Sequence, residues 1–148
     1  MRALIQRVKQ SSVEVDGEII GAIGRGILIL LGVTHSDTEE SAGYLALRCS
    51  NLRIFEDSEN KMNLSVNDVK GEALVISQFT LYGDTTRGNR PSYSDAAQPE
   101  QAESLYDKFV YHLRKEIGDD KVKTGKFRAM MNVHLINDGP VTVMVESK

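Results

Sequence analysis

The stretch "NVHLINDGPVTVMVES" (132–147) contains two runs of alternating apolar residues, separated by Asn137-Asp138-Gly139-Pro140. Alternation with a period of two is typical of strands that bury one face, so we expect two strands here. A proline inside a sheet removes a ladder hydrogen bond and is normally confined to an edge strand, a strand start or a bulge. Because only about 5 to 6% of X-Pro bonds in folded proteins are cis, the residues alone predict a trans turn between the two strands.

The composition predicts one globular domain spanning residues 1–148. Of the 148 residues, 41% are hydrophobic and 26% are charged, and the single cysteine, Cys49, excludes an intrachain disulfide or a multi-cysteine metal site. We expect Cys49 to be a buried small apolar side chain. There is no run of about 18 apolar residues and no signal-peptide pattern, so we expect a cytoplasmic protein without a membrane segment. The net charge of -3 argues against a dedicated nucleic-acid-binding domain, which is usually strongly basic.

The first third of the chain, residues 2–33, predicts a meander of strands. Asp16-Gly17 lies between β-branched runs and is typical of a hairpin turn. The run 27–31 lacks polar alternation, which indicates a central strand covered on both faces. "GAIGRG" (21–26) joins two strands without opening a helix, so it predicts a plain hairpin turn and not a phosphate-binding loop.

Two helices follow from capping residues and apolar spacing. The first is predicted over 38–50, with Ser36 or Asp37 as its N-cap, and the second opens at Pro99 and ends at Gly118. A polar loop precedes a strand predicted over 72–82, and the segment 83–98 is predicted to be a long ordered loop. The element order therefore predicts an α+β fold, a mixed, barrel-like sheet with two helices packed on one side.

The chain contains no G-x-S-x-G elbow, no H-E-x-x-H, no P-loop and no G-x-G-x-x-G that follows a strand. The three histidines, His35, His112 and His134, are scattered and lack the helical spacing of a metal-ligand pair, so we expect neither a metal nor a cofactor. Polar residues do end an apolar strand at "SQFTLY" (77–82) and lead into the long loop, where sites are commonly built. Composition alone favours an edge strand that turns polar as it leaves the core, so both interpretations stay open.

"SQFTL" (77–81) and "NDGPVT" (137–142) together resemble the D-aminoacyl-tRNA deacylase family. "VDGEIIGAIGRGILILLGV" (15–33), "RGNRPSY" (87–93) and "GKFRAMMNVHLINDGPVT" (125–142) resemble family segments in the same order, so the resemblance covers the whole chain. The chain departs from the family pattern at Arg128, where a glycine usually follows the phenylalanine.

The resemblance implies a homodimer in which a cis Gly139-Pro140 reaches into the partner's pocket and rejects L-aminoacyl-tRNA by steric clash. It implies hydrolysis of the ester bond of D-aminoacyl-tRNA, and of mischarged glycyl-tRNA, as chiral proofreading in translation. The backbone N–H groups of Phe79 and Thr80 would stabilise the oxyanion. Thr80 as a covalent nucleophile is disfavoured because its motif offers no base. The residues that the resemblance assigns to the reaction and to substrate binding are Ser77, Gln78, Phe79, Thr80, Arg7, Asn137, Gly139, Pro140 and Val141.

The partners implied are the 3′ end and acceptor stem of an aminoacylated tRNA, and a second copy of the chain. Six cations are predicted phosphate contacts: Arg87, Arg90, Lys121, Lys123, Lys126 and Arg128. Two alternatives stay open. One is a non-catalytic dimer that binds RNA ends, and the other is an unrelated hydrolase in which Thr80 or Ser77 works with a distant histidine.

Overall fold

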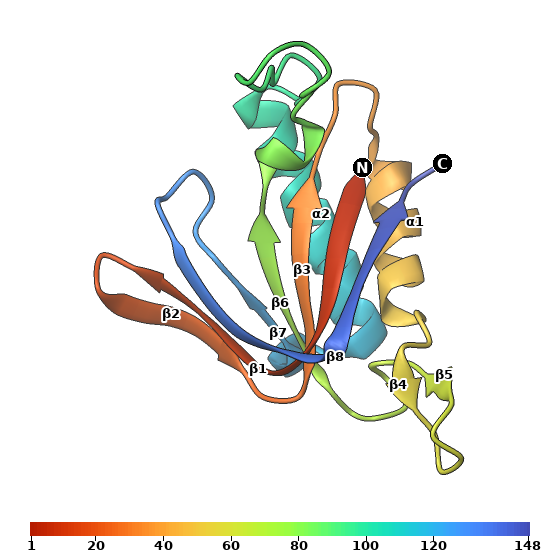
Figure 1. Cartoon of the computed structure of the whole chain (residues 1–148). Helices are drawn as coiled ribbons and strands as arrows, with labels where there is room; N and C mark the ends of the chain where they lie inside the picture. Colours follow the sequence, from red (N-terminus) through yellow and green to blue (C-terminus); the bar gives the residue numbers. More distant parts are fainter.

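The computed structural model describes all 148 residues (Figure 1). The strands are β1 (Arg2–Val15), β2 (Glu18–Ile23), β3 (Gly26–Gly32), β4 (Phe55–Glu56), β5 (Met62–Leu64), β6 (Glu72–Ser77), β7 (Val122–Thr124) and β8 (Asn132–Glu146). The helices are α1 (Glu39–Ser50) and α2 (Pro99–Ile117), with 3₁₀ turns η1 (Phe79–Tyr82) and η2 (Asp119–Lys121). Neither helix is long and apolar enough to cross a membrane.

The long strand β1 organises a six-stranded mixed sheet. One edge of β1 pairs with β8 along almost its whole length, and the other edge pairs with β3 and then with β2. β6 adds in parallel to β3, and β7 adds in parallel to β6. β2 also contacts β6 and β7, so the sheet curls back on itself, and both helices lie on one side (Figure 1). The predicted α+β, barrel-like fold with two helices on one side is therefore confirmed.

The predicted meander is wrong in one respect. The hairpin at Asp16-Gly17 is present, with positive φ at both residues, but β3 pairs with β1 and not with β2. Because β1 is 14 residues long, its one edge accommodates both strands in succession. Residues 24–25 therefore link two strands that lie along one edge of β1, and the segment 21–26 is not a hairpin turn.

The central strands bury both faces, as the unbroken apolar run at 27–31 predicts. Ile29 and Val75 point to the main core between the sheet and the helices, whereas Leu28 and Leu74 point into a smaller core inside the barrel. Side chains of one strand alternate between the faces of a sheet, so a strand between two cores must be apolar at every position.

The helix ends follow local capping chemistry. Thr38, and not Ser36 or Asp37, is the N-cap of α1: its Oγ1 accepts the Ser41 amide at 3.3 Å, and Ser41 Oγ accepts the Thr38 amide at 3.2 Å. Asp37 instead accepts the Thr34 amide at 2.8 Å, which excludes it from capping. α2 starts at Pro99 and ends before Gly118, whose φ of 108° is favourable only for glycine, as predicted.

The strand predicted over 72–82 stops at Ser77. The Gln78 amide still donates to Leu31 O at 2.8 Å, but β3 ends at Gly32, so the chain beyond has no strand partner. Local bonds replace the ladder: the Leu81 amide donates to Gln78 O at 3.3 Å and the Gly83 amide to Thr80 O at 3.0 Å. The polar loop predicted before this strand also differs, because it contains the small hairpin β4–β5.

The stretch 132–147 forms one strand and not two. β8 pairs with β1 on both sides of the Gly-Pro, with Val8 opposite Asn137 and Gln6 opposite Thr142. Residues 138–141 therefore form a bulge opposite Arg7 alone, and the Gly139-Pro140 bond is cis. The trans turn expected from residue statistics is wrong, whereas the cis bond implied by the family resemblance is present. A bulge on an edge strand accommodates proline because no ladder hydrogen bond is required there.

Candidate active site

A cavity of about 690 Å³ opens where the parallel strands β3 and β6 end. Nineteen residues line it, of which 14 are hydrophobic, and Ser77, Gln78 and Phe79 are among them. A mostly apolar cavity of this size with a few polar groups is typical of a small-ligand site. The SQFT segment (77–80) therefore lies at a cavity, and is not an edge strand that merely turns polar.

The start of η1 presents backbone donors beside this cavity. The first N–H groups of a helical turn have no acceptor within the turn. In this segment Gln78, Leu81 and Gly83 donate to backbone carbonyls. Phe79 and Thr80 are the first two residues of η1, so neither amide has an acceptor within its own turn.

The side chains around these amides show no activated nucleophile. Gln78 Nε2 donates to Thr80 Oγ1, so the threonine hydroxyl faces an amide donor and not a base. The Phe79 ring, 57% exposed, meets Tyr93 edge to face with 5.1 Å between ring centroids. The segment therefore offers an exposed aromatic surface and backbone donors.

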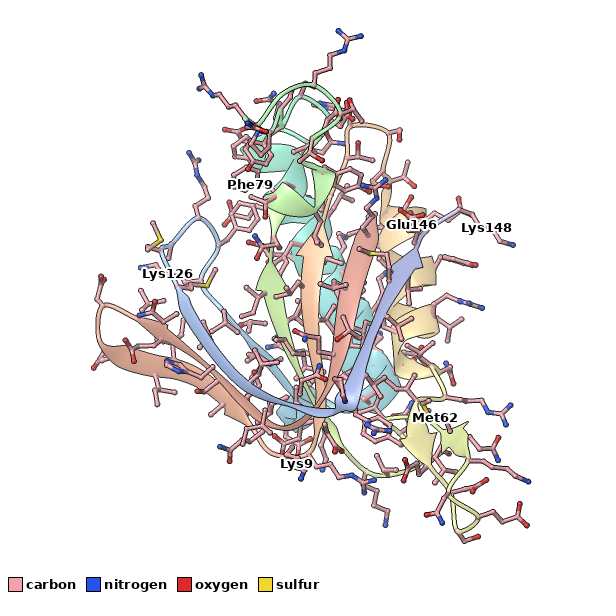
Figure 2. The ribbon with its side chains drawn as sticks, in the orientation of Figure 1. Lys9, Met62, Phe79, Lys126, Glu146 and Lys148 are labelled. Carbon is pink, nitrogen blue, oxygen red and sulfur yellow. The ribbon has the colours of Figure 1, made fainter.

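The β7–β8 connection forms the opposite wall of the cavity. Phe127 packs toward Tyr106 of α2, with 6.0 Å between ring centroids, and the next four residues also line the cavity. Arg128 has a φ of 63°, a left-handed value that costs most L-residues about 1 to 2 kcal/mol. This backbone conformation explains why a glycine suits the position, and the loop accommodates an arginine without losing it. Figure 2 shows Phe79 and Lys126 in the half of the molecule away from Lys9.

The Gly-Pro segment (137–142) is held by Arg7 of β1. The buried Arg7 guanidinium donates from Nε to Asp138 O at 3.0 Å and from Nη1 to Ile54 O at 2.7 Å, and Nε lies 3.5 Å from the Asp138 carboxylate. A Cβ added at Gly139 would lie 3.1 Å from Arg7 Nη2 and 2.8 Å from Val141 Cγ2. Arg7 therefore supports the bulge from below, and glycine fits at 139 because a side chain would collide.

Asn137 closes the same bulge from within. Its Oδ1 accepts the Val141 amide at 2.9 Å, and its Nδ2 donates to Val141 O and to Thr142 Oγ1, both at 3.2 Å. All the polar groups of the Asn137 side chain are therefore used to hold the bulge in one conformation.

The structure does not bring the two segments together within one chain. Across the sheet, through β1 and β3, Asn137 is level with Glu72 of β6 and Thr142 is level with Leu74. Gly139-Pro140 lies between these two levels, so three to five residues separate it from Ser77 along the strand direction. At about 3.3 Å per residue this is roughly 10 to 17 Å, and three strand spacings add about 14 Å across the sheet. Arg7, Asn137 and Val141 lie with the Gly-Pro segment, and not with the SQFT segment.

The six predicted phosphate contacts are divided between two regions. Arg128 lines the cavity, Lys126 lies on the same turn, and Arg87 and Arg90 lie on the loop 83–98, whose end also lines the cavity. Lys123 lies on β7 opposite Leu74, and Lys121 Nζ donates to Lys70 O at 3.3 Å, so both lie nearer the start of β6.

The histidines and acids form no cluster. No group of three His, Cys, Asp or Glu side chains is close enough to hold a metal ion, and no histidine lines the cavity. His35 Nε2 lies 2.7 Å from Ser94 O, and His134 Nε2 lies 3.8 Å from Glu14. The geometry thus gives Thr80 and Ser77 no histidine partner.

Burial raises the pKa of three side chains near the core. It raises the pKa of Tyr82 to about 12, although Arg2 opposes the shift, and it raises the pKa of Tyr106, whose hydroxyl donates to Val75 O at 2.8 Å. Cys49 is buried, as predicted, and burial raises the pKa of its thiol to about 12. Near neutral pH these three groups stay protonated.

Sequence reasoning assigned no role to several residues that build the cavity. Tyr93, Phe127, Met130 and Met131 line it, and all four lie in segments that carry the family resemblance. Their position in those segments was the available signal, but only the packing of the loops shows that they face the SQFT segment.

Comparison with known proteins shows the family of the chain. The profile of the D-Tyr-tRNA(Tyr) deacylase family matches residues 4–146. The D-aminoacyl-tRNA deacylase of Thermosipho melanesiensis is 57% identical over 148 residues, covering 100% of this chain and 98% of that protein. The D-aminoacyl-tRNA deacylase of Bacillus cereus (strain G9842) is 59% identical and covers 100% of both chains.

Two solved structures share the fold. One, described as "c-Myc DNA Unwinding Element Binding Protein", has a TM-score of 0.95 and 46% identity and covers 100% of this chain and 99% of the other. The second, described as a probable eukaryotic D-amino acid tRNA deacylase, has a TM-score of 0.84 at 18% identity, covers 98% of each chain, and shows the fold alone. The chain therefore belongs to the D-Tyr-tRNA(Tyr) deacylase family, a family of hydrolases.

Proposed function

We propose that the protein hydrolyses the ester bond of D-aminoacyl-tRNA and releases the free D-amino acid and tRNA. The observation that carries this proposal is the start of η1 at an apolar cavity, where the amides of Phe79 and Thr80 have no acceptor within their turn. Ester hydrolysis passes through a tetrahedral oxyanion, and two converging N–H donors are the usual means of stabilising it. A donor of this kind contributes about 2.7 to 4 kcal/mol to the transition state.

The reaction needs little else from the protein. An aminoacyl ester on the terminal ribose is already activated, and its neighbouring 2′-hydroxyl can orient the attacking water. Ser77 and Gln78 line the cavity and would position the ribose or the adenine. Thr80 acts through its amide, because its hydroxyl accepts from Gln78 and has no base beside it.

We infer that the working unit is a homodimer in which each Gly-Pro segment enters the cavity of the partner. The separation of the two segments on one chain supports this, since a single copy cannot bring both to one substrate. Arg7 and Asn137 hold Gly139-Pro140 rigidly, so its backbone can serve as a fixed wall for the substrate's α-ammonium group. A rigid wall excludes the L-isomer by collision.

This mode of selection leaves the D side chain loosely specified. Glycine has no side chain to collide, so mischarged glycyl-tRNA is also a substrate. Removing the D-aminoacyl esters is chiral proofreading of translation, which takes place in the cytoplasm. The cations of the loop 83–98 and of the β7–β8 turn would bind phosphates of the acceptor end, with Arg87, Arg90, Lys126 and Arg128 nearest the cavity.

The first test measures amino acid release from D-tyrosyl-tRNA and L-tyrosyl-tRNA with EDTA present. We expect rapid loss of the D-ester while the L-ester survives. Survival of both esters, with and without added divalent metal, would favour the non-catalytic RNA-end-binding dimer. Cleavage of both would contradict the Gly-Pro wall.

A mixed dimer tests the cross-subunit site. Gly139→Ala should disable the wall, because the added Cβ collides with Val141 and Arg7, and Thr80→Pro should remove an oxyanion donor. Each homodimer should then lose D-selective hydrolysis. A dimer with one subunit of each kind has one intact composite site and should recover about half of the wild-type rate; no recovery would place the whole site in one subunit.

A further inference from the structure

The turn 126–129 presents one side chain at the edge of the cavity. The Ala129 amide donates to Lys126 O at 3.2 Å, and Arg128 occupies the third position of this turn with a φ of 63°. Phe127 packs inward toward Tyr106 while Arg128 is exposed. The packing of Phe127 therefore anchors the turn, and Arg128 is exposed to solvent at the edge of the cavity.

Arg128 is the one charged residue among the 19 that line the cavity. None of the ion pairs or side-chain hydrogen bonds of the chain uses its guanidinium, whose five donors are therefore available. An unpaired guanidinium beside apolar walls attracts an anion more strongly than one in open water, because the local dielectric constant is lower.

The other side of the opening carries an exposed aromatic pair. Phe79 is 57% and Tyr93 is 40% exposed, and their rings meet edge to face. Exposed aromatic rings together with a nearby arginine are the usual means of holding single-stranded nucleic acid, with bases on the rings and phosphate on the guanidinium.

We propose that Arg128 is a substrate-binding residue that holds a phosphate of the single-stranded 3′ end of the tRNA. This inference rests on the proposed deacylase function, and it names the atoms that position the ester at the Phe79 and Thr80 amides. Arginine binds phosphate in a bidentate geometry, so the contact also orients the terminal nucleotide.

The decisive variant is Arg128→Gly, because glycine adopts the left-handed turn without strain and leaves the loop backbone unchanged. Lys70→Gly is the matched control: Lys70 is exposed, has a φ of 53°, and lies outside the cavity. Both substitutions remove one positive charge and place glycine at a position of positive φ.

With D-tyrosyl-tRNA, Arg128→Gly should raise KM about tenfold and leave kcat within about twofold, since a phosphate contact acts on binding. The slope of log affinity against log salt should fall by about 0.7, the value for one phosphate of a single strand. Lys70→Gly should change neither. Arg128→Lys should recover part of the affinity, because lysine keeps the charge but cannot bind phosphate in a bidentate geometry.

Two further substrates separate the sources of the anion. D-tyrosyl-adenosine has no phosphate, so wild type and Arg128→Gly should cleave it equally. D-aspartyl-tRNA should lose as much affinity as D-tyrosyl-tRNA. A loss confined to D-aspartyl-tRNA would assign Arg128 to the side-chain carboxylate and overturn the proposal, as would unchanged KM and salt slope, or slower cleavage of D-tyrosyl-adenosine.

Equilibrium binding of uncharged tRNA to the same variants, followed by fluorescence anisotropy over a range of salt, keeps the inference independent of turnover. If wild type fails to hydrolyse any D-ester, the deacylase proposal fails, while the difference in binding between Arg128→Gly and Lys70→Gly still decides the role of Arg128. Equal binding by the two variants would overturn it.

Discussion

The SQFT segment and the Gly-Pro segment differ in how their polar groups are satisfied. At the Gly-Pro segment, Arg7 and Asn137 make hydrogen bonds that fix the bulge. At the SQFT segment, the amides of Phe79 and Thr80 have no acceptor within their turn, and the Phe79 ring is exposed. The polar groups of the Gly-Pro segment are held by hydrogen bonds within the chain, whereas the first amides of η1 have no acceptor in their own turn. The first segment is therefore suited to act as a rigid wall and the second to bind a reacting group.

Removing the support of the rigid segment should have the largest effect. Arg7→Ala leaves Ile54 O, Asp138 O and the Asp138 carboxylate without their donor, and we expect a loss of about 3 to 5 kcal/mol in the free energy of unfolding, measured by urea titration. D/L selectivity should fall with it. Lys9→Ala, an exposed position on the same strand, should cost less than about 0.5 kcal/mol. Equal losses would show that Arg7 is not the support.

Removing a donor from the SQFT segment should affect the rate and not the fold. Thr80→Pro deletes one amide at the start of η1, where proline is tolerated, and should lower kcat about 10² to 10³-fold. Thr80→Ala keeps the amide and should retain substantial activity. Complete loss of activity in Thr80→Ala, with unfolding unchanged, would instead identify the hydroxyl as a nucleophile.

Loosening the bulge from within should have an intermediate effect. Asn137→Ala removes three hydrogen bonds around Gly139-Pro140, and we expect about 1 to 3 kcal/mol of destabilisation and weaker discrimination against L-tyrosyl-tRNA. Asn137→Asp keeps the acceptor for the Val141 amide, so its stability and D/L discrimination should lie between those of wild type and Asn137→Ala. If Asn137→Ala is stable and fully D-selective, the wall does not depend on this contact.

The smallest effect concerns Tyr82 at the end of η1. Burial raises its pKa from 10.0 to about 12, so the folded state favours the neutral phenol. The stabilisation from Tyr82 is therefore complete below pH 10 and is lost as the pH rises from 10 to 12. Absorbance titration of wild type and Tyr82→Phe should show one tyrosine fewer ionising near pH 12. If Tyr82→Phe instead lacks a tyrosine that ionises near pH 10 in wild type, Tyr82 is not buried in solution.

Local features were predictable from the sequence because their causes are local. Asp16-Gly17, Pro99 and Gly118 define a hairpin turn and the ends of α2 through backbone preferences of single residues. The apolar run 27–31 indicated a strand between two cores. The N-cap of α1 was misplaced by one or two residues, because Asp37 is used by the Thr34 amide.

Partner strands decided the remaining differences. The strand pattern predicted over 72–82 could not show that β3 stops at Gly32, and without that partner the chain forms η1. The Gly-Pro could be read as the join between two strands, because only the pairing with β1 shows one strand with a four-residue bulge opposite Arg7.

For the site, the sequence alone indicated two candidate segments, because the SQFT and Gly-Pro segments were predicted from their residues and their family resemblance. Only the tertiary structure decided that Arg7 and Asn137 hold the bulge, that Tyr93 and the β7–β8 turn close the cavity, and that the two segments lie apart on one chain. The physical reason is that turns and strand faces depend on neighbours in sequence, whereas the cavity and the support from Arg7 depend on contacts between segments that are distant in sequence, such as Arg7 and Asp138.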